Sequence, residues 1–123
     1  MEAIQRDIKN EIVIEKVNLV RATLNEAYEM KDNLIEDGLD YKKIIVDLSS
    51  CDYIDSTFLG ALIFSYRKIK ERDGQVVLVI GNKGLTNSFI FREISSIFNV
   101  YNSINEAIEE LKKNNVEILS EDK

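Results

Sequence analysis

The chain has 123 residues, of which 45% are hydrophobic and 31% charged, and its net charge of −6 argues against a nucleic-acid partner. It contains no histidine and one cysteine, which excludes the commonest metal ligand, the commonest general base and an intramolecular disulfide, so we expect no metal site. The sequence lacks a run of about 18 apolar residues and a secretory signal, so we expect no membrane insertion and a cytoplasmic location.

The chain begins with two segments of β type. Residues 4–9 and 11–17, the second of which alternates, predict two paired strands with a turn at Lys9 and Asn10. There is no proline, repeat or low-complexity stretch to divide the chain. We therefore predict a single domain over residues 1–123.

A helix is predicted over residues 24–37. Thr23 and Glu26 have the spacing of a capping box, in which a hydroxyl and a carboxylate each satisfy a free amide of the starting helix. Gly38 stands where a left-handed residue would end the helix. The helical spacing predicts one buried face, formed by Leu24, Ala27, Tyr28, Leu34 and Ile35.

Two apolar strands flank a second predicted helix. Residues 43–48 and 75–80 are β-branched runs without alternation, which is typical of strands covered on both faces. Between them, apolar residues recur at helical spacing over 59–69 and the pattern stops near Asp73 and Gly74. Strand, helix and strand in so short a space predict a right-handed parallel crossover.

The last third of the sequence predicts a weaker helix over 85–94, a short strand over 99–101, and a helix that starts at a second capping box, Ser103 to Glu106. The polar segment 114–123 is either frayed or an added helical turn. Together the elements predict an α/β fold, with a mixed sheet of four or five strands and about four helices.

The segment between the first buried strand and the second helix lies beyond the carboxyl ends of the strands, where partner surfaces gather in such folds. Asp55, Ser56 and Thr57 all suit a helix N-cap, and free amides and the helix dipole there favour added negative charge. A phosphate on Ser56 could be held at this position, while Asp55, Asp52 and Asp47 would repel it or ligate a bridging cation. The alternative is plain capping of the helix.

A compound motif occupies residues 45–60. It comprises Asp47-Leu48-Ser49, the apolar pair Tyr53-Ile54, and Asp55-Ser56-Thr57-Phe58-Leu59-Gly60. The motif resembles the signature of the STAS domain family, which includes anti-sigma factor antagonists and cytoplasmic domains of sulphate transporters. In the bacterial antagonists, Asp-Leu-Ser leads to an apolar pair and then Asp-Ser-Ser/Thr-Gly-Leu-Gly. Later segments extend the resemblance over residues 10–112, notably Tyr66-Arg67-Lys68-Ile69 and Ile97-Phe98-Asn99-Val100-Tyr101.

The resemblance implies a bacterial regulator of transcription with no catalysis or cofactor of its own. Family members bind an anti-sigma factor, usually also a serine kinase, and so displace the sigma factor. Carried over to this chain, the phospho-acceptor is Ser56, flanked in the contact surface by Asp55 and Thr57, and a phosphatase reverses the modification. A phosphate adds about −1.5 to −2 charges at neutral pH, enough to break an interface of modest size without a conformational change.

Two phenylalanines on the second predicted helix are further candidates for partner contact. Phe58 replaces the family's glycine, which leaves phosphorylation of Ser56 open. It is either core, because Leu62 follows four residues later, or an aromatic anchor for the partner. Phe64 points away from the apolar face of the helix. It is a second partner contact, part of a homodimer surface, or a stray exposed or loop-covered aromatic.

Two other functions stay open. One is a STAS scaffold or adaptor subunit of a sensory or transport complex that is not phosphorylated, which Phe58 favours. The other, an enzyme that binds nucleotide on a flavodoxin-like sheet, needs a phosphate loop and a base. Gly81-Asn82-Lys83-Gly84 lacks the ending of a P-loop, and we interpret it as a turn. We interpret Cys51 as a small apolar filler rather than a reactive thiol.

Overall fold

A five-stranded mixed sheet forms the centre of the structure, a computed structural model that describes residues 2–121. β1 pairs antiparallel with β2, and the other neighbouring pairs in this sheet are parallel. The predicted mixed α/β sheet is confirmed. Its strands, in spatial order, are β1 (Ile4–Lys9), β2 (Ile12–Val17), β4 (Lys43–Asp47), β6 (Gln75–Val79) and β7 (Val100–Tyr101).

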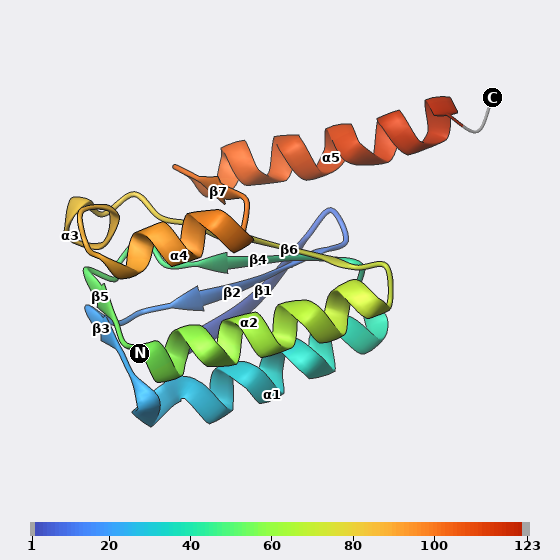
Figure 1. The fold of residues 1–123 in the computed structure, drawn as a ribbon. Coiled ribbons are helices and arrows are strands. Elements are labelled where there is room, and N and C mark those ends of the chain that lie inside the picture. The colour runs from blue at the N-terminus through green and yellow to red at the C-terminus, as the bar shows by residue number, and fades with distance from the viewer. Residues whose placement is uncertain (1, 122–123) are drawn as a thin grey trace.

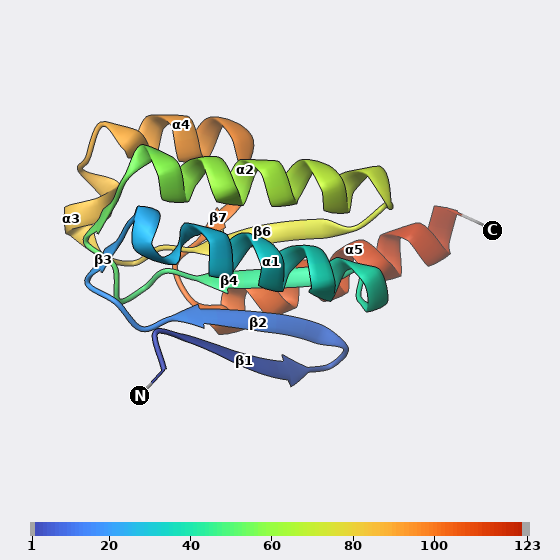
Figure 2. The same cartoon turned by 90° about the horizontal axis from the view of Figure 1, so that it is seen from below.

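Helices cover both faces of the sheet (Figure 1). The described residues form α1 (Leu24–Asp40), α2 (Ser56–Glu71), α3 (Lys83–Thr86), α4 (Ile90–Ile97) and α5 (Ile104–Glu121). On one face, α1, α2 and α4 enclose the larger core, and Figure 2 shows α1 and α2 side by side there. On the other face, α5 packs over a smaller apolar cluster. None of the described helices is long and apolar enough to cross a membrane.

Most of the predicted elements are confirmed, with shifts at their ends. The hairpin turn lies at Asn10 and Glu11, one residue later than predicted, and their φ angles of 53° and 63° are left-handed. The single helix predicted over 85–94 is instead the pair α3 and α4. The sequence did not predict β3 (Arg21–Ala22) and β5 (Tyr53–Ile54), which pair in a separate sheet. Two residues are too few to show a period of two.

The predicted end of α1 is wrong, and its predicted buried face is right for Ala27 and Leu34 but wrong for Leu24 and Tyr28. The helix continues through Gly38 to Asp40, and none of the described glycines has a positive φ. A Cβ at Gly38 would lie 2.7 Å from Cγ1 of the buried Ile69 on α2, so this glycine permits close helix packing. The buried residues of α1 are Ala27, Met30, Leu34, Asp37 and Gly38, whereas Leu24 and Tyr28 are 60% and 74% exposed.

The C-terminal helix starts where the sequence predicts. The backbone N–H of Glu106 donates to the Ser103 hydroxyl at 3.2 Å, which confirms that half of the capping box. Of the polar segment 114–123, the part up to Glu121 continues α5 as helix. Residues 122–123 lie outside the described residues.

A buried pair of acids joins the β1–β2 hairpin to α1. Glu15 on β2 is fully buried and Asp37 on α1 nearly so. Arg6, the register partner of Glu15, donates from Nε to Asp37 Oδ1 at 2.8 Å and lies 4.0 Å from Glu15 Oε2. Burial, with the Asp37 carboxylate beside it, raises the pKa of Glu15 to about 9, although Arg6 opposes the shift. Glu15 is therefore protonated at neutral pH and can donate a hydrogen bond to Asp37.

This pKa predicts how stability changes with pH. Between the ordinary Glu15 pKa of 4.5 and the folded value of about 9, the folded chain binds more protons than the unfolded chain. The contribution of Glu15 to the free energy of unfolding therefore falls as pH rises through that window. Glu15→Gln cannot titrate, so we expect the wild type to lose stability relative to this variant by up to about 1.4 kcal/mol per pH unit. Urea unfolding over a pH series measures the difference.

The exposed residue Glu11 provides the matched control for this measurement. Glu11→Gln should follow the wild-type pH dependence, because its carboxylate faces solvent. Parallel curves for the wild type and Glu15→Gln would contradict a protonated Glu15 in the folded chain.

Candidate functional site

The predicted site lies at the edge of the sheet where α1 and α2 begin. β3 and β5 pair parallel there, with Arg21 opposite Tyr53 and Ala22 opposite Ile54, so the segments that precede the two helices lie side by side. In Figure 1 this edge includes the starts of both helices and the small helix α3. It is the carboxyl end of β2 and β4, as the sequence predicted for a partner surface.

Asp55 holds the starts of both helices. Its Oδ1 accepts the backbone N–H of Phe58 at 2.8 Å, which makes Asp55 the N-cap of α2. Its Oδ2 accepts the backbone N–H of Leu24 at 2.9 Å, the first residue of α1. Its own N–H donates to the Ala22 carbonyl at 3.1 Å. One carboxylate thus satisfies free amides from two helices and fixes their relative position.

Ser56 and Thr57 are the first two residues of α2, and both are exposed. The predicted capping of the helix by this segment is confirmed, with Asp55 as the capping residue and neither Ser56 nor Thr57 in that role. The hydrogen bonds within the described part of the chain do not involve either hydroxyl. The structure therefore leaves the Ser56 oxygen free, in solvent, at a helix N-terminus.

Phe58 belongs to the core, and its prediction as a partner contact is wrong. Its side chain is fully buried in the larger core, with Leu62 one turn further along α2. The ring points inward, away from the exposed start of the helix, so it does not cover Ser56. The predicted outward position of Phe64 is confirmed, since that side chain is 46% exposed.

The neighbouring aspartates do not gather into a cation site. Asp47 is buried, and its Oδ1 accepts the backbone N–H of Ser49 at 3.0 Å. Asp52 is exposed, and Asp55 is engaged with the two helix starts. Among residues 2–121, no three His, Cys, Asp or Glu side chains are arranged to hold a metal ion.

The two weaker candidates have structural roles. Cys51 is fully buried, and burial raises the pKa of its thiol to about 12, as befits a small apolar filler. The segment 81–84 is not a turn, because Asn82 caps α3 by accepting the N–H of Gly84 at 2.7 Å. A Cβ at Gly84 would lie 2.9 Å from the Cβ of Asp52, so α3 packs closely against the loop before α2.

Exposed apolar side chains lie on the segments beside the start of α2, and the sequence did not indicate them as exposed. Val20 and Leu24 are 61% and 60% exposed, and Tyr53 stacks under the guanidinium of Arg21 at 4.1 Å. The backbone N–H groups of Asp52 and Tyr53 donate to the Val20 carbonyl, so the loop that carries Val20 lies beside the segment that leads to Ser56. No periodicity marks Val20 or Tyr53, which lie in a loop and a two-residue strand, and the helical spacing placed Leu24 on the buried face of α1, where it does not lie.

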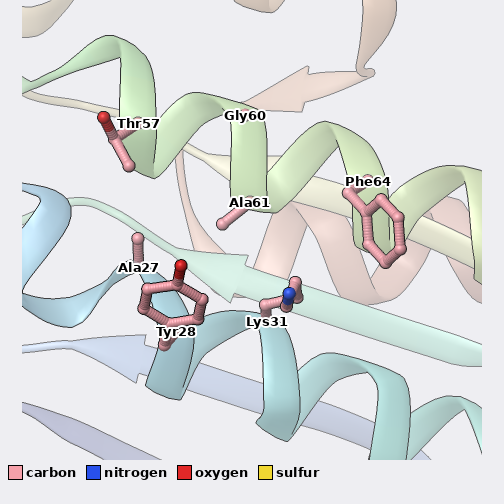
Figure 3. A pocket seen from close by; sticks show the side chains of 7 residues that line it. All are labelled: Ala27, Tyr28, Lys31, Thr57, Gly60, Ala61 and Phe64. Atoms are coloured by element: carbon pink, nitrogen blue, oxygen red, sulfur yellow. The ribbon is translucent and has the colours of Figure 1, made fainter.

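A hollow of about 240 Å³ continues from this edge between α1 and α2. Figure 3 shows Thr57, Gly60, Ala61 and Phe64 on the α2 side, opposite residues of α1. Its α1 residues are Ala27, Tyr28 and Lys31. Thr57 lines the hollow, so the hollow starts one residue from Ser56 and ends at Phe64.

Comparison with known proteins identifies relatives of this architecture. The family model described as STAS domain matches residues 1–118. A Thermotoga maritima protein provisionally named an anti-sigma factor antagonist is 30% identical over 73 residues. That match covers 59% of this chain and 65% of the relative, so it spans less than two thirds of the relative's length.

Solved structures share the fold over most of the chain. The crystal structure of a Thermotoga maritima protein with the same provisional name has a TM-score of 0.77 and 25% identity, covering 89% of this chain and 94% of that one. The anti-sigma factor antagonist SpoIIAA of Bacillus has been solved unphosphorylated, with a TM-score of 0.70, 16% identity, and coverage of 89% and 98%. Its phosphorylated form has a TM-score of 0.67, 15% identity, and coverage of 89% and 99%.

The double role of Asp55 predicts a large effect of its removal. Asp55→Ala leaves the first amides of both helices without their acceptor, so we expect a loss of about 1–3 kcal/mol in the free energy of unfolding. Asp55→Asn keeps one acceptor oxygen and should fall between Asp55→Ala and the wild type. Urea denaturation measures all three proteins.

Asp52→Ala is the matched control, because Asp52 is exposed and its carboxylate caps neither helix. We expect this change to stay within about 0.5 kcal/mol of the wild type. Equal stabilities for Asp55→Ala and Asp52→Ala would show that Asp55 does not hold the two helix starts.

Proposed function

This chain belongs to the STAS domain family, and we propose that within it the chain is an anti-sigma factor antagonist. It binds an anti-sigma factor that is also a serine kinase, and so releases the sigma factor for transcription. Phosphorylation at Ser56 ends the binding, and a phosphatase restores it. The protein acts in the cytoplasm by binding alone, without catalysis of its own.

The free hydroxyl of Ser56 is the observation that carries this proposal. It stands exposed at the first residue of α2, and the neighbouring Asp55 already caps the helix. A kinase can therefore reach the oxygen without unfolding the helix. The N-terminal amides and the helix dipole favour the added negative charge. SpoIIAA, a relative in fold, exists in both unphosphorylated and phosphorylated forms.

The surroundings of Ser56 explain why a phosphate would weaken binding. The exposed Val20, Leu24 and Tyr53 give this edge an apolar character that suits a protein interface. A phosphate would place about −1.5 to −2 charges among them, and burying that charge against a partner costs far more than burying a hydroxyl. The partner would therefore leave the surface while the fold of the chain stays the same.

The scaffold alternative loses its main support. It was favoured because Phe58 replaces the family's glycine and left phosphorylation of Ser56 open, but Phe58 is buried in the core and Ser56 is exposed. The flavodoxin-like enzyme has no support either, because the glycine-rich segment at 81–84 starts a one-turn helix capped by Asn82. Partner switching is the function that the exposed residues of this edge support best.

The charge mechanism makes a prediction about position 56. Ser56→Asp should bind the anti-sigma factor at least about tenfold more weakly than Ser56→Ala, since it alone adds a charge. Calorimetric titration with the anti-sigma factor, captured from native lysate and purified, measures both affinities. Incubation with that kinase and ATP, followed by mass spectrometry, should map the phosphate to Ser56.

Ser103→Asp is the matched control for this experiment. It also adds an acidic residue at the start of an exposed helix, and aspartate preserves the capping of α5. We expect it to bind as the wild type does, because α5 lies on the opposite face of the sheet. Equal affinities for Ser56→Asp and Ser56→Ala, or a phosphate mapped to another residue, would refute the proposed switch.

A further inference from the structure

An apolar groove runs between α1 and α2 on the outer side of the helical layer. The hollow of about 240 Å³ beside Thr57 shares Phe64 with a second hollow of about 360 Å³ towards the ends of the helices. The second hollow is lined by Ile35, Gly38, Leu39, Phe64, Lys68, Ile69, Glu71 and Arg72. Phe64 therefore stands at the middle of one groove rather than at the edge of two separate hollows.

Three large side chains along this groove are exposed and take no part in the packing of the helices on the core. Tyr28 is 74% exposed, Leu39 59% and Phe64 46%, and none of the three belongs to either core cluster. Figure 3 shows Tyr28 and Phe64 on opposite helices, with the small residues Gly60 and Ala61 between them on α2. Small residues beside two exposed rings leave room for a side chain of another molecule.

The charges at the rim of the groove are mainly positive. The Nζ of Lys31 lies 5.2 Å from the centre of the Tyr28 ring and 5.3 Å from that of Phe64, and the Nζ of Lys68 lies 5.7 Å from Phe64. Arg72 also lines the groove, against the single acid Glu71. This cationic rim stands out in a chain whose net charge is −6. Charge complementarity therefore selects a partner segment with acidic side chains.

We propose that this groove binds an amphipathic helix of the anti-sigma factor, with an apolar side chain seated beside Phe64 and acidic side chains at Lys31 and Lys68. An amphipathic helix in an apolar groove is a common mode of recognition, anchored at spacings of three and four residues. The inference rests on the proposed function for the identity of the partner. The groove itself is observed in the structure and does not depend on the proposed function.

The position of the groove links this docking segment to the phospho-acceptor. Thr57 lines the groove and directly follows Ser56, so a bound helix would pass the acceptor oxygen. An acidic helix is attracted by Lys31 and Lys68 along the groove, and a phosphate on Ser56 would repel the part of that helix beside Thr57. Phosphorylation of Ser56 would therefore weaken binding of the acidic helix that the cationic rim attracts.

A second copy of this chain is a poorer occupant of the groove. A two-fold interface brings the same surface of both copies together, so two mainly cationic rims would meet. Like charges across an interface cost several kcal/mol. The charge of the rim therefore favours an acidic partner over self-association.

Two synthetic peptides test the proposal. One is a fluorescein-labelled helical peptide of about 16 residues with leucine and phenylalanine on one face and glutamate on its flanks. The other carries lysine in place of every glutamate. Fluorescence anisotropy should show the acidic peptide binding at least about tenfold more tightly than the basic one. Backbone amide spectra should place the bound peptide at residues 27–31 and 57–68.

Variants of the exposed groove residues sharpen the test, and circular dichroism verifies that each is folded. Phe64→Ala should weaken binding of the acidic peptide at least about tenfold, whereas Phe89→Ala, which removes a more exposed ring outside the groove, should leave binding unchanged. Lys31→Glu should reverse the preference between the peptides. Ser56→Asp should weaken the acidic peptide as well.

Several results would overturn the proposal. These are equal affinity for the two peptides, no binding of the acidic peptide, amide shifts outside the groove, or no effect of Phe64→Ala. A dimer in light scattering that Phe64→Ala abolishes would assign the groove to a second copy. If the peptide experiments fail while Ser56→Asp still weakens binding to the anti-sigma factor, only the groove proposal is refuted. If the peptides bind as expected while Ser56→Asp and Ser56→Ala bind the anti-sigma factor equally, the proposed function is lost instead.

Discussion

The carboxylate of Asp55 is the contact on which the candidate site depends. It accepts the first free amide of α1 through one oxygen and the capping amide of α2 through the other. Because Asp55 does the capping, the hydroxyl of Ser56 is left without a structural role and stands in solvent. The same contact holds the start of α1, with the exposed Leu24, beside the start of α2. An acceptor that does not support the fold can be modified without unfolding it.

Close packing of α1 on α2 extends this surface into a groove. Gly38 lets the two helices approach at Ile69, and the inward ring of Phe58 anchors the start of α2 in the core. With those residues inside, Tyr28 and Phe64 are left outside, where Lys31 lies near both rings. The acceptor and the groove therefore lie on the same helix, and a partner that binds one contacts the other.

The sequence was sufficient for most of the fold and for the centre of the site. Unbroken β-branched runs and capping boxes placed the central strands and the helix starts, and the Asp55-Ser56-Thr57 segment marked the start of α2. Features that depend on contacts distant in sequence were not accessible. Gly38 was taken as a helix stop, because its neighbour Ile69 cannot be seen in the local pattern. The hydrogen bond from Leu24 to Asp55 joins residues 31 positions apart and was likewise not accessible, whereas burial of Phe58 was one of the two alternatives that the local pattern left open.

The central claim is that a charge on Ser56 changes the surface of the protein and leaves its fold unchanged. Backbone amide spectra of the unmodified and fully Ser56-phosphorylated protein test it most directly. The account predicts chemical-shift changes confined to the helix starts and their loops, about residues 20–24 and 52–61, together with loss of anti-sigma factor binding. Changes that spread through β4, β6 and α5, or phosphorylated protein that still binds with the original affinity, would contradict it.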